Sequence, residues 1–292
     1  MNFVKKIRIC LVVGLVLVFG CSIALANPTV NIVNLSGGSI YIYDTGGSTQ
    51  TPIVLADGKT LSNHTLAAAA GRRIWVASDH LKTVESGGQP SPFDTNADAG
   101  VMFSFFEYTV TGDKYTIDLS YVDYFSYPLT LKFKADDSNI CVKDFEYGFK
   151  SFTHVANALM NAGNPWNQLI WQGYGPKKTY RIFAPSFIWT SNPASLPTNL
   201  KTFYNAYPPD GTQLFLPNKN NEVWQNYAQI PGFNVPVEPR LITVGYSKAL
   251  LSNSSVDRNK KHGFYIFPKD AQAEFTNLQN SNTMTVTVYP YK

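Results

Sequence analysis

Hydrophobic and polar residues in the first part of the chain alternate with a period of two. Residues 30–34 and 39–43 each place apolar side chains at every second position, and a pair of glycines follows each segment. Side chains of a β-strand point alternately to two faces, so this pattern predicts strands with one buried face, joined by glycine turns. Five further segments read in the same way, namely 73–78, 101–110, 115–121, 129–134 and 283–289. The sequence therefore predicts a mainly β, antiparallel fold.

The middle of the chain has a helical period instead. Between 142 and 162, apolar residues recur every three or four positions. They are Phe145, Phe149, Phe152, Val155, Ala156 and Leu159. Gly163 can cap such a helix and Pro165 cannot continue it, so we expect a helix over 142–162. A shorter helix is predicted at 222–228, and the proline-rich connections within 185–239 predict loops with little regular structure.

These patterns suggest two domains. We expect a β domain built from residues 27–137 and 246–292, which are the two ends of the mature chain. An α/β domain of residues 138–245 would be inserted into it, with a cleft between the two.

Residues 1–26 have the three-part layout of a secretory signal peptide. Three basic residues lie within the first eight, a run of about a dozen apolar or small residues follows, and Ala24-Leu25-Ala26 forms a cleavage motif. The apolar run is shorter than the about 20 residues that span a bilayer. The competing interpretation is lipidation at Cys21, but Phe19 departs from the lipobox pattern. We expect a secreted protein without a membrane anchor.

Composition narrows the possible functions. Hydrophobic residues make up 44% of the chain and charged residues 15%, against a usual charged share of about 25%, which excludes a disordered chain. Without the leader, 21 basic residues face 20 acidic ones, so no basic excess for nucleic acid is expected. The mature chain keeps only Cys141, which we expect to be a buried or inert thiol. Its four histidines lack metal-ligand spacing, and we expect neither metal nor cofactor.

The candidate chemistry lies in a predicted hairpin that carries three acidic residues, Glu107, Asp118 and Asp123. With a three-residue loop, Glu107 faces Leu119 and shares a face with Asp123. The carboxyl groups would then lie about 8–10 Å apart, which overlaps the about 6.5–9.5 Å of inverting glycosidases. With a two- or four-residue loop, Asp118 faces Glu107 instead, and the sequence leaves both registers open. In the alternative interpretation, all three acids are solvated charges on an exposed face of the sheet.

Several segments resemble a known family. They include GRRIW at 71–75, FEYT at 106–109 and DLSYVDYFSYP at 118–128. Together with SPFDTN at 91–96, IFAP at 182–185 and VWQNY at 223–227, they resemble glycoside hydrolase family 64, the bacterial β-1,3-glucanases of the thaumatin-like superfamily. The resemblance covers most of the mature chain. It implies a thaumatin-like β-sandwich or barrel.

The resemblance also implies roles for individual residues. Glu107 would be the general acid and Asp123 the general base of an inverting hydrolysis, and Thr109 would line the sugar cleft. Phe103 and its neighbours should desolvate Glu107 and raise its pKa, so that it holds a proton. Asp123 at a strand end should stay ionised.

Four further residues are candidates for substrate binding, namely Asp118, Tyr121, Tyr124 and Arg73. The two tyrosines flank the candidate base, and aromatic rings stack on sugars. Arg73 is the nearest basic residue, since the arginine that many thaumatin-like proteins carry after the tryptophan is replaced here by Ala77.

The leading hypothesis is a secreted, monomeric, endo-acting β-1,3-glucanase that inverts the anomeric centre and acts on β-1,3-glucan without a cofactor. The alternative is a non-catalytic thaumatin-like protein that binds β-glucan or the cell wall, since a fold does not dictate a function. A third class, a secreted β module for protein contacts, predicts acids that are dispersed rather than convergent.

Overall fold

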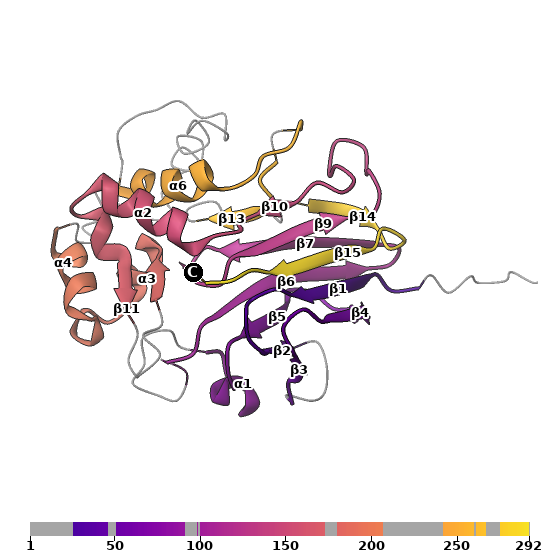
Figure 1. Ribbon diagram of the computed structural model, residues 1–292, viewed down its shortest axis with the longest axis horizontal. Coiled ribbons are helices and arrows are strands. Elements are labelled where there is room, and N and C mark those ends of the chain that lie inside the picture. Colours follow the sequence, from indigo (N-terminus) through magenta and orange to yellow (C-terminus); the bar gives the residue numbers. More distant parts are fainter. Residues whose placement is uncertain are drawn as a thin grey trace, which may run out of the picture.

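The computed structural model describes residues 26–45, 51–90, 98, 100–172, 180–206, 242–259, 261–266 and 275–291. Strands dominate these ranges and helices gather at one end of the molecule (Figure 1). The predicted mainly β class is therefore confirmed, whereas the thaumatin-like assignment stays a prediction. Within the same ranges, no helix is long and apolar enough to cross a membrane.

The largest sheet has seven strands. Six follow the order β13 (Phe264–Ile266), β7 (Lys114–Tyr121), β6 (Phe103–Thr111), β5 (Arg72–Ala77), β2 (Ile40–Asp44) and β3 (Ile53–Leu55), and β14 (Phe275–Gln279) also pairs with β7. A five-stranded sheet follows the order β10 (Tyr147–Gly148), β9 (Leu129–Phe133), β15 (Met284–Val288), β1 (Thr29–Asn34) and β4 (Thr60–Thr65).

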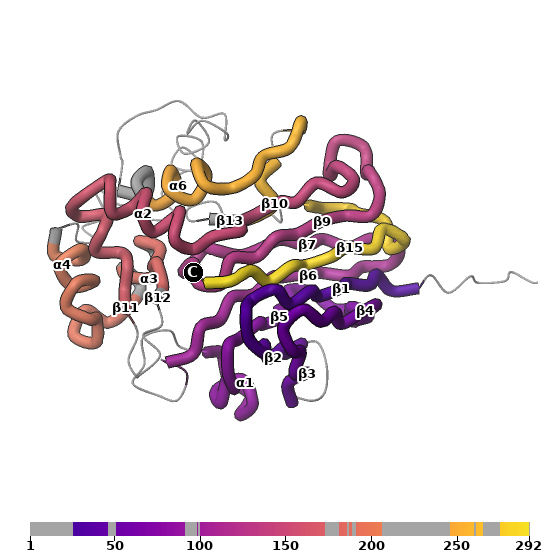
Figure 2. Tube along the Cα trace, in the orientation of Figure 1, coloured from indigo at the N-terminus to yellow at the C-terminus, as the bar shows by residue number. Residues whose placement is uncertain are grey.

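Segments that are far apart in the sequence meet in both sheets. β1 and β15 lie side by side in Figure 2 and pair in parallel, as do β13 and β7. The prediction of purely antiparallel sheets is therefore wrong for these two pairs. Parallel neighbours need a long crossover connection, and the period of a strand does not reveal which distant strand becomes its neighbour.

A third sheet of three strands connects the helical end to the rest. It consists of β11 (Ile170–Gln172), β12 (Tyr180–Phe183) and β8 (Tyr124–Phe125). The helical end contains α2 (Phe152–Ala162), α3 (Pro185–Thr190), α4 (Thr198–Ala206) and α6 (Ile242–Asn253), with the 3-10 turns η1 (Trp166–Leu169) and η2 (Pro193–Ser195). A single short helix, α1 (Lys82–Glu85), follows β5 at the other side (Figure 1).

The long predicted helix begins ten residues later than expected. Ser151 caps α2, because its hydroxyl accepts a hydrogen bond from the backbone N–H of His154 at 3.3 Å. Before that cap, Tyr147 and Gly148 pair with β9, so Phe145 and Phe149 follow a helical period without lying in a helix. Helices α3 and α4 also occupy a stretch that was predicted to be loop. The predicted helix at 222–228 lies outside the described residues.

The domain division stays a prediction, and contacts cross both of its boundaries. Strand β10 lies beyond residue 138 and still pairs with β9. The other boundary, 245/246, falls inside α6, which packs against α2.

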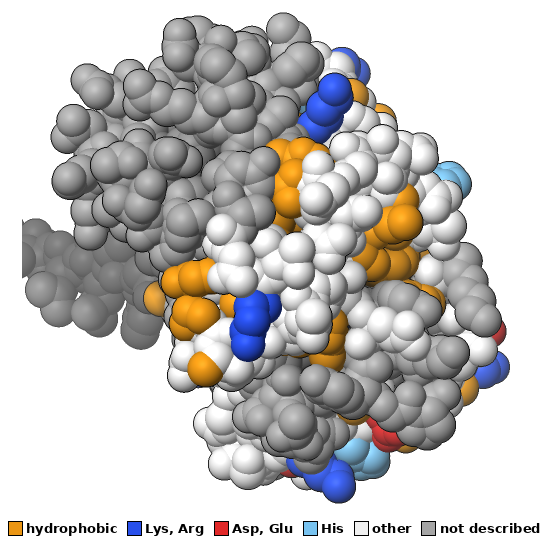
Figure 3. All heavy atoms as spheres, turned by 90° about the vertical axis from the view of Figure 1, so that its left-hand side faces the viewer, with side chains coloured by type: hydrophobic (Ala, Val, Ile, Leu, Met, Phe, Trp, Pro, Cys, Tyr) orange, Lys and Arg blue, Asp and Glu red, His pale blue; other side chains and the backbone are white. Residues whose placement is uncertain are grey.

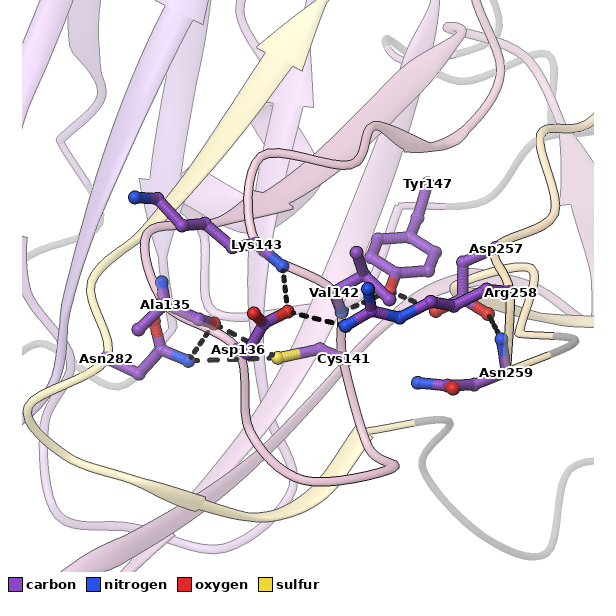
Figure 4. A network of polar contacts seen from close by, with 10 residues as sticks. All are labelled: Ala135, Asp136, Cys141, Val142, Lys143, Tyr147, Asp257, Arg258, Asn259 and Asn282. Atoms are coloured by element: carbon purple, nitrogen blue, oxygen red, sulfur yellow. Dashed lines mark hydrogen bonds and ion pairs between the residues drawn. The ribbon is translucent and has the colours of Figure 1, made fainter.

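A polar network ties the loop after β9 to the loop after α6 (Figure 4). The Tyr147 hydroxyl donates to the Asp257 carboxylate and accepts from the backbone N–H of Val142. Beside this network, Cys141 is fully buried and its Sγ lies 3.6 Å from the carbonyl of Ala135. Burial raises the pKa of the Cys141 thiol to about 12. The expectation of a buried thiol is therefore confirmed, and a thiol with that pKa is a poor nucleophile at neutral pH.

Candidate active site

The turn of the β6–β7 hairpin decides which residues face each other. Gly112 and Asp113 form a two-residue loop, and Thr111 pairs with Lys114. Gly112 has a φ of 63°, and glycine at the first loop position is typical of the type II′ turn, whose twist matches that of the strands. Of the registers that the sequence leaves open, the structure has the one that sets Asp118 opposite Glu107.

A row of charged side chains consequently crosses the large sheet. Glu107 of β6 faces Asp118 of β7 on one side and Arg73 of β5 on the other. Opposed residues of neighbouring strands point to the same face. Asp118 is 8% exposed, whereas the Glu107 and Arg73 side chains each keep 36% of their surface exposed. The row therefore runs from a buried acid to a half-exposed ion pair.

Arg73 is fixed from several sides. Its Nε donates to Oε2 of Glu107 at 2.9 Å, and its guanidinium carbon lies 4.7 Å from the ring centroid of Phe105. The Trp75 ring is 6.0 Å away, and Oε1 of Gln89 accepts from Nη1 at 3.5 Å. Exposed ion pairs alone contribute little to stability, but aromatic faces on the same strands restrict where this guanidinium can lie.

The aromatic residues around Glu107 enclose it only in part. Phe106 lies on the opposite face of β6, and the Glu107 side chain keeps 36% of its surface exposed. Burial instead affects Asp123, because it raises the pKa of that carboxyl above the ordinary value. The positive charge of Arg73 partly offsets this rise. The same guanidinium thus acts on both candidate catalytic carboxyls.

Asp123 reaches this region by a turn rather than by strand alternation. Strand β7 ends at Tyr121, and Asp123 lies between it and β8. Its backbone carbonyl accepts from the N–H of Ala184 at 2.9 Å, directly after β12. In a continued strand, Asp123 would point to the face opposite Asp118. The turn is therefore what brings Asp123 within the field of Arg73.

The two tyrosines that flank Asp123 are core residues. Tyr121 is 0% exposed, packs edge-on against Phe125 and Phe149, and accepts from the backbone N–H of Leu129. Tyr124 is 4% exposed and packs against Phe103. Stacking of Tyr121 on a sugar, as the sequence suggested, does not agree with its complete burial, so we correct its role to that of a core residue.

Thr109 lies two residues beyond Glu107 on the same face. Its side chain is half-buried, and Oγ1 accepts from the backbone N–H of Gly71 at 2.9 Å. This bond holds the start of β5 against β6.

Arg181 is a buried residue that the sequence gave no reason to select. It is 0% exposed, donates to the carbonyl of Val101 and stacks on Phe103, with 4.5 Å from its guanidinium carbon to the ring centroid. Burial lowers its pKa to about 10, so it stays charged at neutral pH. Arg181 connects β12 to β6 and so supports the turn that carries Asp123. The local sequence around Arg181 contains no signal that this basic side chain is buried.

The remaining charges do not form a second centre in the described part of the chain. No three side chains of metal-ligating type come together there. On the face shown in Figure 3, the lysine and arginine side chains stand apart from one another. Glu107 and Asp123 are carboxyl groups that can donate and accept protons, and the charge of Arg73 acts on both.

Comparisons with known proteins agree on one family. The profile of glycoside hydrolase family 64, described as β-1,3-glucanase, matches residues 23–231. Among curated proteins, none matches the chain.

The solved structures that resemble the chain include three β-1,3-glucanases. A family 64 β-1,3-glucanase domain from Clostridium beijerinckii has a TM-score of 0.54 and 13% identity, covering 90% of this chain and 98% of that one. A laminaripentaose-producing β-1,3-glucanase of family 64 from Paenibacillus barengoltzii, complexed with laminarihexaose, has a TM-score of 0.54 and 15% identity, covering 90% and 74%. A laminaripentaose-producing β-1,3-glucanase in complex with laminaritetraose has a TM-score of 0.45 and 21% identity, covering 59% and 56%.

Proposed function

Because the chain belongs to glycoside hydrolase family 64, the β-1,3-glucanases, we propose that it is a secreted enzyme that cleaves internal bonds of β-1,3-glucan with inversion. The observation that carries this proposal is the pair of carboxyl groups that share the field of Arg73. Both side chains are half-buried, but Glu107 is ion-paired to Arg73, whereas desolvation raises the pKa of Asp123. Inverting hydrolysis requires two carboxyl groups, one as general acid and one as general base. The assignment of Glu107 as the acid follows the family resemblance, since desolvation favours the proton on Asp123.

Glu107 acts as the general acid in this proposal. Arg73 binds Oε2, so the proton of the acid form sits on Oε1, from which it passes to the glycosidic oxygen as the bond to C1 breaks. The leaving glucan chain departs as a neutral alcohol. The exposure of Glu107 lets a polymeric substrate reach it.

Asp123 acts as the general base. It accepts a proton from a water molecule whose oxygen attacks C1 from the face opposite the leaving group. The reducing end released is therefore an α-anomer. A base with a raised pKa takes up this proton more readily, and the positive charge of Arg73 favours the ionised form of Asp123.

The alternative proposal, a protein that binds glucan without cleaving it, makes a different prediction. The deciding experiment incubates the purified mature chain with laminarin and follows reducing ends together with the anomeric configuration by proton NMR. Release of oligosaccharides that are α-anomers before mutarotation supports the inverting glucanase. Release of β-anomers contradicts inversion, and retention on laminarin without release supports the binding protein.

The pH dependence of hydrolysis tests the influence of Arg73. Only the ionised form of Asp123 is a base, so activity rises with pH through the pKa of this carboxyl and its acid limb lies above that of an ordinary aspartate. In Arg73→Gln, a positive charge that favours ionisation is gone. We therefore expect the acid limb of kcat/KM to move to higher pH.

The matched control is Arg258→Gln, which removes an exposed arginine that pairs with Asp136. It should leave the acid limb where it is. An unchanged limb in Arg73→Gln would show that Arg73 does not act on the base.

A further inference from the structure

Two residues from the helical end hold the turn that carries Asp123. Strand β7 ends at Tyr121 and β8 begins at Tyr124, so this turn is short. On one side, the hydroxyl of Tyr246 in α6 donates to the backbone carbonyl of Tyr121, with 2.7 Å between the two oxygens. On the other side, the carbonyl of Asp123 accepts from the backbone N–H of Ala184 at 2.9 Å. The backbone around Asp123 is therefore fixed by groups that lie outside the large sheet.

Both anchors of the turn belong to segments that pack on each other. Ala184 directly precedes α3, which packs against α6, and α6 also packs against α2 at the helical end (Figure 1). Tyr246 and Ala184 are each 0% exposed. Water therefore cannot take the place of either donor, and a buried carbonyl that loses its donor stays unpaired. The position of the turn depends on how the helical end packs on the sheet.

The ring of Tyr121 is held separately from its carbonyl. It packs edge-on against Phe125 and Phe149, and its hydroxyl accepts from the backbone N–H of Leu129 at 3.3 Å. None of these contacts involves Tyr246. Removal of the Tyr246 hydroxyl would therefore leave the Tyr121 ring in place and release only the backbone of the turn.

The Tyr246 hydroxyl keeps its proton and acts only as a donor. Burial raises the pKa of Tyr246 well above its ordinary value, and the negative charge of Asp123 adds to this rise. Tyr246 is therefore neither an acid nor a base at the pH of hydrolysis. Because the charge of Asp123 acts on it, the hydroxyl lies close to the carboxyl whose backbone it holds.

We propose that Tyr246 is a positioning residue for the general base, because its bond to the Tyr121 carbonyl fixes the turn from which Asp123 reaches the attacking water. This inference rests on the proposed function. In an inverting reaction the water must fit between the base and C1. A displacement of about 1 Å in such an arrangement can cost about 10²-fold in rate. The helical end thereby takes part in hydrolysis through a side chain that does not touch the substrate.

Tyr246→Phe tests the role of this one hydroxyl, because the variant keeps the buried ring. We expect kcat on laminarin to fall by up to about 10²-fold, as for a displaced catalytic group. KM should stay unchanged, because the fully buried side chain cannot contact glucan. Steady-state release of reducing ends over a range of laminarin concentrations measures both constants.

Tyr115→Phe is the matched control at the other end of β7. The Tyr115 side chain is also buried, and its hydroxyl donates to the backbone carbonyl of Asn282 at 2.7 Å. Each variant loses one buried bond of the same kind, so both should lower Tm to a similar degree. Tyr115→Phe should keep the wild-type kcat. A wild-type kcat in Tyr246→Phe, or an equal loss of kcat in both variants, would overturn the inference.

A double variant tests whether Tyr246 acts through Asp123. In Asp123→Asn no base remains to be positioned, so adding Tyr246→Phe should cost no further activity. Residues that act through one another show such non-additive losses, whereas independent losses multiply. A double variant that loses the full factor of Tyr246→Phe again would contradict the inference.

The wild type separates failure of this inference from failure of the proposed function. If it releases oligosaccharides from laminarin and Tyr246→Phe does so at the same rate, only the inference is refuted. If the wild type does not cleave laminarin, the proposed function fails and the inference fails with it.

Discussion

Glu107→Gln is expected to reduce laminarin hydrolysis by about 10²–10⁴-fold, because a general acid contributes a factor of this size. The amide has the shape of the acid and its oxygen can still accept from Nε of Arg73, so the sheet should fold normally. Steady-state release of reducing ends measures the loss. Glu146→Gln is the matched control, because Glu146 also pairs with a cation, Lys150, away from the site.

A substrate that leaves without a proton identifies the role of Glu107. Cleavage of a 2,4-dinitrophenyl β-laminarioligoside releases a stable phenolate, so it does not need the general acid. We expect Glu107→Gln to recover most of the wild-type rate on this substrate. A loss as large as that on laminarin would instead mean that Glu107 binds substrate or positions Arg73.

Asp123→Asn is expected to lower laminarin hydrolysis by a similar about 10²–10⁴-fold, because an amide cannot take a proton from the attacking water. The dinitrophenyl substrate should not rescue this variant, since the water must still be deprotonated. Rescue by the better leaving group would contradict the role of Asp123 as base. The two substrates together therefore distinguish the acid from the base.

Asp123→Asn, which lowers activity, is expected to increase the stability of the folded protein. The pKa of Asp123 is raised in the folded state, so the folded protein binds this proton more tightly than the unfolded chain. The stability that the Asp123 carboxyl contributes is present below the ordinary aspartate pKa of about 3.9. It is lost as the pH rises through the raised pKa of the folded state. Asn cannot ionise and avoids this loss.

Melting temperatures across pH measure this difference. Melting temperatures are measured between about pH 3 and neutrality. The Tm of Asp123→Asn should rise relative to that of the wild type as the pH increases above the ordinary aspartate pKa of about 3.9. Asp136→Asn, at an exposed ion pair with Arg258, should show no such gain. A difference in Tm that does not change with pH would contradict the raised pKa of Asp123.

Local patterns predicted the strands well but not their partners. The alternation at 101–110 and 115–121 corresponds to β6 and β7 within two residues at each end. The loop between them was left open, although glycine followed by one residue is itself a signal for a two-residue turn. The opposition of Glu107 to Asp118 depends on that single residue of loop length.

The candidate site depends on contacts that no local pattern contains. That Arg73 lies opposite Glu107 follows from the order of strands β5 and β6, and the sequence offered Arg73 only as the nearest basic residue. Tyr121 was predicted to bind sugar because it lies close to Asp123 in the sequence. In the structure its ring packs against Phe149, which comes from a distant segment. The helix predicted from 142 failed for a similar reason, because pairing with β9 competes with helical period at Tyr147.

The position of β15 between β9 and β1 has a consequence for how the protein comes to be folded. Of the five strands in this sheet, the central one, β15, comes last in the sequence and is therefore the last of the five to leave the ribosome. Until then, β1 and β9 each expose an unpaired edge on the side that β15 will occupy. This sheet therefore closes only after β15 has been made, and its many long-range pairings make closure slow. A sheet that stays open until its last strand is made is exposed to aggregation for longer, and remains available to factors that handle unfolded polypeptides.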